Sequence, residues 1–224
     1  RTAGHRDPLP TLVAEPRVFF NEALNGQWFI VPGLIVVVTM LLSAFLTSLC
    51  VAREYERNTI EQILVSPVSG PALMLGKLAP YLAVGAIQVA SVTLASHVLF
   101  EVPIRGSLLF LSGASLLFLV GAQALGLALS AALRSQQVAM QMSIVITVLP
   151  SILLSGFVFP IRNMPWVLQI LSWVVPARYF IRIVRGVFLK GVGPAVLWPE
   201  LIAMVVFAFL MILLATSRFR RSLQ

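Results

Sequence analysis

Five long apolar runs constrain what this chain can fold into more than any other feature of its sequence. Apart from Glu200 at the edge of the last one, the runs contain no Asp, Glu, Lys or Arg. Each is close to or above the roughly 20 helical residues needed to cross ~30 Å of hydrocarbon. They cover residues 29–52, 78–100, 107–133, 138–159 and 198–217. Because uninterrupted apolar runs lack the alternation of a membrane β-strand, we predict an all-α integral membrane protein with five transmembrane helices.

The composition agrees with a membrane location. Hydrophobic residues make up 59% of the chain and charged residues only 11%, against about 25% in a soluble domain. The net charge of +8 could indicate nucleic acid, but the basic residues are scattered between the apolar runs. Anionic lipid headgroups are therefore the expected partner, and no nucleic acid is expected. The single Cys50 excludes a disulfide framework and a cysteine-rich metal site.

The two ends of the chain predict its orientation. Lys and Arg are divided almost evenly between the two sides, but "RFRR" directly follows the last run and favours a cytoplasmic C-terminus. Residues 1–28 would then end an exterior segment, residues 29–217 would form the membrane domain, and residues 218–224 a cytoplasmic tail. The chain begins at Arg1 without a signal-peptide pattern, as expected for a piece of a longer protein or a processed product. An exterior N-terminus implies one more span upstream, and therefore six in the full protein.

Two features inside the runs concern helix packing. Ala122, Gly126 and Ser130 form a stripe of small residues at every fourth position, which allows another helix to approach closely. Packing within the chain is favoured over a contact between subunits. Pro150 lies in the middle of its predicted span and should kink it, either as a hinge or as a static bend.

The long connector at residues 160–195 is apolar and contains two helix-like pieces separated at Pro176. In the second piece, Arg178, Arg182 and Arg185 share one face of a helix. This pattern predicts an interfacial amphipathic helix, its arginines among lipid headgroups or at a pore mouth. The lipid-surface interpretation is favoured over contact with a substrate.

Chemical motifs are few. No acidic residue lies deep in a run, whereas ion-coupled carriers usually place a carboxylate at mid-membrane. His97 is expected to form an interfacial polar pair with Glu101 rather than a metal or proton site. The stretch "GPALMLGK" (70–77) has the wrong glycine spacing for a phosphate-binding loop, and Leu78 replaces the magnesium-binding hydroxyl. It is better interpreted as the start of a helix, with Ser69 as its cap. We therefore do not expect an enzyme.

A charged island at residues 53–77 separates the first two runs. As one helix, "REYERNTIEQIL" would place Glu54, Arg57 and Glu61 on one face and an apolar ridge beside it. A short amphipathic helix between two spans is suited to docking a partner. The alternative is a helix that lies passively on the membrane surface.

Four stretches together carry a resemblance to a known family. They are "FIVPGL" (29–34), "AREYERNTIEQILVSPVSGPALMLGKLAPY" (52–81), "LSGFVFPIRNMP" (154–165) and "VPARYFIRIVRGVFLKG" (175–191). With them, the chain from about residue 17 onward resembles the permease subunits of type-2 ABC exporters of the bacterial multidrug or antibiotic efflux kind. Tyr55 and Asn58 are mild departures from that family's pattern, at positions where a Trp or Lys and a Gly are expected.

The resemblance implies a role for each segment. The island would carry the cytoplasmic coupling helix that contacts the ATPase, with the contact made by Arg53, Glu54, Glu56, Arg57, Ile60, Glu61, Ile63, Leu64 and Pro67. Residues 160–195 would form exterior re-entrant helices, with a gate at Pro160, Arg178, Arg182 and Arg185. ATP and magnesium would bind to the separate ATPase subunit, and this chain would bind no cofactor. A second permease subunit, identical or different, would complete a dimer in the bacterial inner membrane.

The expected activity is ATP-driven export of an amphiphilic drug-like or lipid-like substrate. The spans contain hydroxyl and amide side chains and no fixed charge. Hydroxyls and amides in spans more often pack helices than bind ligands. The candidates for the substrate path are Thr47, Gln88, Gln141 and Thr147. The alternatives are a non-transporting scaffold or regulatory subunit and a secondary carrier, which the missing mid-membrane carboxylate disfavours.

Overall fold

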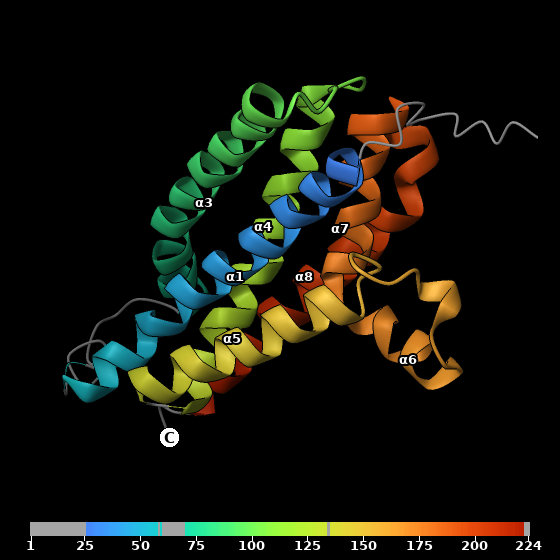
Figure 1. Cartoon of the computed structure of the whole chain (residues 1–224). Coiled ribbons are helices and arrows are strands. Elements are labelled where there is room, and N and C mark those ends of the chain that lie inside the picture. Colours follow the sequence, from blue (N-terminus) through green and yellow to red (C-terminus); the bar gives the residue numbers. More distant parts are fainter. Residues whose placement is uncertain (1–25, 58, 60–69, 134, 222–224) are drawn as a thin grey trace, which may run out of the picture.

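The computed structural model describes residues 26–57, 59, 70–133 and 135–221. These residues form helices, turns and loops, with no strand among them (Figure 1). Five long helices correspond to the five predicted spans, and each is long and apolar enough to cross a membrane. They are α1 (Gly26–Glu56), α3 (Gly70–Phe100), α4 (Leu108–Leu133), α5 (Gln136–Leu153) and α8 (Pro194–Arg221). The prediction of an all-α, multi-pass membrane protein is confirmed.

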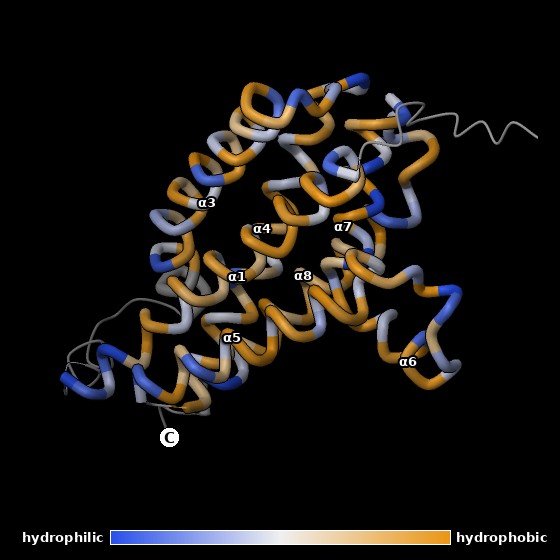
Figure 2. Tube along the Cα trace, in the orientation of Figure 1, coloured by the Kyte–Doolittle hydropathy of each residue, from blue (hydrophilic) through white to orange (hydrophobic). Residues whose placement is uncertain are grey.

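The helix α4 lies at the centre of the bundle, between α1 and α8 (Figure 1). Most of α1 and α4 is buried, whereas α3, α5 and α8 leave most of their apolar side chains exposed. Figure 2 shows that hydrophobic residues predominate along these helices, with hydrophilic positions along α3 and near the ends of the others. Such a distribution matches helices whose outer faces contact lipid and not water.

The small-residue stripe of α4 packs against α1 of the same chain, as predicted. A Cβ added at Gly126 would overlap the carbonyl oxygen of Ala44 and Oγ1 of Thr47, so the two backbones approach as closely as glycine allows. One turn further on, Ser130 Oγ accepts hydrogen bonds from the backbone N–H groups of Val51 at 3.0 Å and Ala52 at 2.8 Å. Close approach and interhelical hydrogen bonds are the main attractive forces between helices in lipid.

The fourth span ends earlier than predicted. The helix α5 stops at Leu153 and not at residue 159, so Pro150 lies in its last turn and is not a mid-span kink. The N–H of Leu154 donates to the carbonyl of Pro150 at 2.8 Å, and Gly156 follows with a φ of 82°. A positive φ is readily adopted by glycine and takes the chain out of the helix.

The connector after α5 is a bent pair of helical pieces. After the turn η1 (Ile161–Asn163), the pieces α6 (Trp166–Leu171) with η2 (Ser172–Val174) and α7 (Pro176–Arg185) with η3 (Gly186–Lys190) meet at 84°. Pro176 occupies the first turn of α7, where its missing N–H costs nothing. This geometry fits the expected re-entrant helices.

The lipid-surface interpretation of α7 is wrong. Phe180 and Ile183 have no exposed surface and belong to the main core, where the Phe180 ring stacks on Phe118 of α4 at a centroid distance of 4.2 Å. The helix therefore packs inside the bundle. Periodicity correctly separated the apolar face from the arginine face, but it could not say whether protein or lipid covers each face.

The π-helical turn η3 is bonded to the connector between α3 and α4. The backbone N–H groups of Arg105 and Gly106 donate to the carbonyls of Phe188 at 3.2 Å and Val187 at 2.9 Å. In the same connector, the expected His97–Glu101 pair is wrong, because the His97 ring nitrogen Nδ1 lies 3.1 Å from the carbonyl oxygen of Val102 instead.

The charged island is not one helix from residue 53. The helix α1 continues through Glu56, and the chain turns at Arg57, whose N–H donates to the Arg53 carbonyl at 3.1 Å. The sequence predicts a helix that begins at residue 53, but in the structure these residues are the end of α1. Nothing in "AREYE" interrupts a helix, so α1 continues through it. The stretch "GPALMLGK" lies in the first turns of α3, as the helical interpretation predicted. Ser69, the predicted cap, and residues 60–68 lie outside the described residues.

We expect Gly126→Val to destabilise the bundle, because the added side chain would push α1 away from α4. Overpacking of this kind costs about 1–3 kcal/mol. The matched control is Gly113→Val on the same helix, where an added Cβ meets no atom within 4 Å. Thermal unfolding of the purified protein in detergent should show a lower Tm for Gly126→Val alone. Equal Tm values for the two variants would mean that the close α1–α4 contact is not needed for stability.

Candidate functional site

Three helix ends are joined where the charged island meets the membrane domain. Lys77 of α3 forms an ion pair with Glu54 of α1, and both side chains are mostly buried. The Glu56 carboxylate accepts hydrogen bonds from the backbone N–H of Gln136 at 2.7 Å and from the Gln136 side-chain amide. We call Glu54, Glu56, Lys77 and Gln136 the junction.

The junction supplies hydrogen-bond partners to backbone groups at the end of a helix. The first N–H groups of α5 have no partner within the helix, and a carboxylate at this position supplies one and is favoured by the helix dipole. Arg53 adds a contact from its Nε to Oε1 of Gln136 at 3.5 Å. As a result, the end of α1 is connected to the starts of both α3 and α5.

The structure describes only part of the predicted coupling segment. Arg53, Glu54 and Glu56 lie in the last turn of α1, and Arg57 is exposed just beyond it. The other predicted coupling residues lie outside the described residues, namely Ile60, Glu61, Ile63, Leu64 and Pro67. Sequence reasoning missed Lys77 and Gln136. The available signal was the position of Lys77 at the start of the next antiparallel span, opposite the acids that end α1.

At the other end of the bundle, Arg185 is the most connected of the predicted gate residues. Its guanidinium donates to the carbonyl oxygens of Phe29 and Gly156 at 3.1 Å and of Phe157 at 3.3 Å. It also lies 3.6 Å from the centre of the Phe29 ring. One side chain of α7 therefore joins the start of α1 to the segment after α5. Close packing reinforces the contact, since a Cβ on Gly33 of α1 would overlap the Phe157 ring.

The remaining gate residues have different surroundings. Arg178 is buried, donates to Ser172 Oγ and lies 5.1 Å from the Trp173 ring centre. Arg182 is more exposed and pairs with Glu200 of α8 at 3.4 Å. Pro160 is exposed and precedes the turn η1. The arginine face of α7 is thus largely occupied by protein groups, and the structure brings Arg178, Arg182 and Arg185 into different contacts instead of one cluster.

Three of the four substrate-path candidates are hydrogen-bonded inside the bundle. Thr47 and Thr147 are buried and donate to the Ser43 carbonyl at 2.8 Å and the Ser143 carbonyl at 2.6 Å. Gln88 of α3 donates to the Val38 carbonyl of α1 at 3.3 Å. Gln141 differs because it is exposed and lines an open groove of about 500 Å³ at the junction end of α5. The bonds of the first three favour the helix-packing interpretation for those residues.

Comparison with known proteins places the chain in a family. Residues 6–216 match the model of the ABC-2 family transporter protein. The chain is 38% identical over 214 residues to the probable multidrug ABC transporter permease YbhS of Escherichia coli K12, covering 96% of this chain and 57% of that protein. It is 34% identical over 205 residues to the probable multidrug ABC transporter permease YbhR of the same strain, covering 92% and 55%.

A more distant relative is the inner membrane transport permease YhhJ of Escherichia coli K12, with 28% identity over 226 residues, covering 99% of this chain and 59% of that protein. The chain spans a little over half the length of these curated relatives. The family match covers nearly all of the helical bundle described above, including the junction and the bent helices α6 and α7. The chain belongs to the ABC-2 family of transporter proteins.

Proposed function

We propose that this chain is the membrane-spanning permease part of an ATP-driven exporter in a bacterial inner membrane. It moves an amphiphilic, drug-like or lipid-like substrate, using ATP hydrolysed by a separate ATPase subunit. The observation that carries the proposal is the family match over residues 6–216, together with relatives named as multidrug permeases. The helical conformation of "GPALMLGK" supports an external source of energy, because a phosphate-binding loop needs its backbone N–H groups free.

The junction supplies a route for coupling. The segment between α1 and α3 is the proposed contact with the ATPase, and its two ends continue into α1 at Glu56 and into α3 at Gly70. A movement of this segment pulls on α1 and α3 directly, and on α5 through the bonds from Glu56 to Gln136. Three spans would therefore respond together to ATP binding, without any residue of this chain contacting the nucleotide.

The Arg185 contacts supply a gate at the opposite end. Arg185 holds the start of α1 and the segment after α5 against α7 through three carbonyl groups. A change in the tilt of α1 or α5 breaks some of these bonds, and rotation of the guanidinium can replace them. We propose that this set of bonds opens and reforms as substrate leaves, in a dimer whose second permease subunit packs on the exposed faces of α1 and α5. The open groove at Gln141 then lies on the substrate path.

We expect Glu54→Lys and Lys77→Glu each to reduce coupling, because each leaves two like charges facing one another in a mostly buried site. The double exchange, Glu54→Lys with Lys77→Glu, should restore part of the loss, with an interaction free energy of about 0.5–3 kcal/mol. The measurement is ATP hydrolysis and ATP-dependent dye export in proteoliposomes that contain the permease and its ATPase subunit. The permease alone should hydrolyse no ATP above background.

Arg218→Glu is the matched control for the charge reversals, because Arg218 is an exposed cation at the same end of the bundle. It should leave export close to wild type. If the double exchange is no better than the single variants while all of them insert normally, the junction does not transmit the coupling. If the permease exports dye without any ATPase, the proposed function itself is wrong.

We expect the island to be cytoplasmic and residues 160–195 to face the exterior. With Cys50→Ser as background, the Asn163→Cys variant should react with an impermeant thiol reagent in intact cells. The Ser69→Cys variant should react only after the cells are opened. The reason is the basic C-terminal "RFRR", which favours the cytoplasmic side. The opposite labelling pattern would invert the topology.

We expect Arg185→Lys to weaken the exterior gate, because one ammonium group cannot reach three carbonyls in the planar geometry of a guanidinium. Hydrogen bonds from a charged group contribute about 1.5–3 kcal/mol each, so the Tm and the export rate should both fall. Arg182→Lys is the control, since a lysine can still pair with Glu200. Similar Tm values and export rates for both lysine variants would show that Arg185 is not part of the gate.

A further inference from the structure

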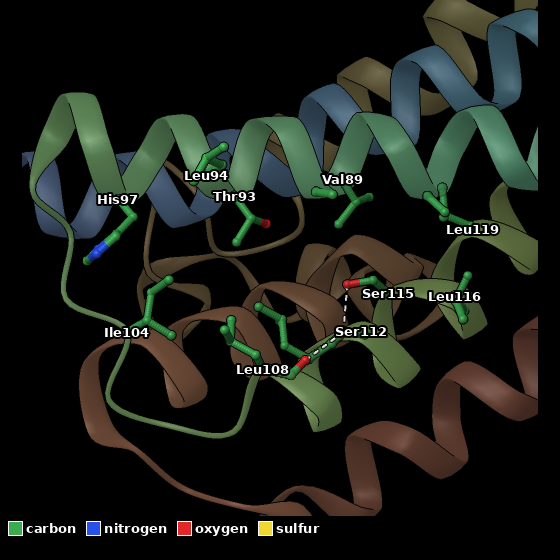
Figure 3. Close-up of a pocket in the computed structure, with 13 residues that line it drawn as sticks. Val89, Thr93, Leu94, His97, Ile104, Leu108, Ser112, Ser115, Leu116 and Leu119 are labelled. Carbon is green, nitrogen blue, oxygen red and sulfur yellow. Dashed lines mark hydrogen bonds between the residues drawn. The ribbon is translucent and has the colours of Figure 1, made fainter.

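A cavity between α3 and α4 is not used by the proposed coupling route or gate. It has a volume of about 460 Å³, within the range of roughly 300–1,000 Å³ that small-molecule sites occupy. Its walls extend along α3 from Ala86 to His97, about 16 Å at 1.5 Å per residue. In Figure 3, side chains of the two helices face each other across this space, with His97 and Ile104 at one end. The wall is mostly apolar and includes Leu94 and Leu108, which are exposed on the outside of the bundle.

The polar groups in the wall are mainly acceptors. The hydroxyls of Ser112 and Ser115 donate to the carbonyls of Leu108 and Leu111, each at 2.7 Å, which leaves their oxygen lone pairs as acceptors. The carbonyl of Val102 can only accept, so Nδ1 of His97 carries the hydrogen in the contact between them. In the neutral ring Nε2 is then an acceptor. Thr93, one turn before His97 on α3, supplies a further hydroxyl.

The charge of the side chains in the wall restricts the chemical class of the ligand further. None of the described residues that line the cavity is acidic. A buried ammonium group would therefore lack a counter-charge, which is costly in an apolar site, whereas a neutral hydroxyl needs only an acceptor. A carbonyl or ether oxygen could accept only from the Thr93 hydroxyl, whereas a ligand hydroxyl could donate to any of the acceptors in the wall.

We propose that the cavity between α3 and α4 binds a membrane-borne amphiphile that has one hydrocarbon chain and a neutral hydroxyl group. The chain lies along α3 and α4 between their leucines, and the hydroxyl donates to the acceptors formed by Ser112, Ser115 and His97. The site lies within one chain and opens towards lipid. Binding at this site requires neither ATP nor an ATPase. This proposal can therefore be tested independently of the export proposal.

The test is photolabelling of the permease in phosphatidylcholine nanodiscs. The probe is a dodecanol derivative with a diazirine in its chain, and the comparison probes are its methyl ether and the corresponding primary amine. The alcohol should label peptides of α3 and α4 that line the cavity. It should do so about fivefold more than the ether, the factor expected for one hydrogen bond. Unlabelled dodecanol should compete with the alcohol probe.

Two sets of variants locate the site. Ala90→Trp fills the cavity from α3 and should reduce labelling by about tenfold, since a filled cavity excludes a second occupant. Ala83→Trp is the matched control, an exposed position of the same helix that does not line the cavity. The double variant Ser112→Ala with Ser115→Ala should bring the alcohol-to-ether ratio towards one while the ether signal is unchanged, which a general structural disturbance would not do.

Three results would overturn the proposal. Equal labelling by alcohol and ether in the unmodified protein would make the cavity an apolar crevice filled by bulk lipid chains. Unchanged labelling in Ala90→Trp would place the probe elsewhere on the bundle. Stronger labelling by the amine than by the alcohol would mean that the site selects a cation and not a neutral hydroxyl.

Discussion

The close approach of α1 to α4 is the contact on which the rest of the bundle depends. In lipid the hydrophobic effect does not drive helices together, so association depends on close packing and hydrogen bonds. Gly126 allows the α1 backbone to come near, and Ser130 then reaches the N–H groups of Val51 and Ala52. With α1 fixed on α4, the ends of α1 define the positions of both regions proposed for function. Its last turn carries the junction acids, and its first turns receive Arg185.

Among the described residues, the charged groups lie near the ends of the helices. At one end, Glu54 of α1 is paired with Lys77, and Glu56 accepts hydrogen bonds from the start of α5. At the other end, arginines of α7 are neutralised or solvated by carbonyl groups, an aromatic ring and Glu200. A charge near hydrocarbon is costly unless it is paired or hydrogen-bonded, so these contacts are specific and few. The same contacts give two separated regions in which a small movement of one helix must change the bonds of another.

The bent pair of helices α6 and α7 shows how irregular backbone is accommodated within the bundle. The π-helical turn η3 does not satisfy its carbonyls in the regular α-helical pattern, and the α3–α4 connector donates to two of them. Gly106 allows this approach, because a Cβ there would lie 2.9 Å from the carbonyl oxygen of Val187. Non-helical backbone is tolerated within a membrane domain where protein groups cover it in this way. The connector between α3 and α4 is therefore part of the support for α7.

The sequence by itself determined the class of protein and the number of long helices. Apolar length and the scarcity of charge suffice for this, since backbone groups in hydrocarbon must be bonded within the segment. It also determined that the stripe at Ala122, Gly126 and Ser130 packs against a helix, and which face of α7 is apolar. The individual hydrogen bonds of the junction and of Arg185 are not encoded in any local pattern, because their partners lie 23 to 156 residues away.

The tertiary structure alone decided what covers each face. The arginines of α7 have the spacing of an interfacial helix, yet that helix lies in the core, because Phe180 and Ile183 pack on protein and not on lipid. In the same way Thr47 and Gln141 are similar polar residues in apolar runs, but one is closed off by Gly126 and the other lines an open groove. Hydropathy measures the preference of a side chain for an apolar environment, and lipid and protein interior satisfy it equally. Only the packing of the helices distinguishes between the two.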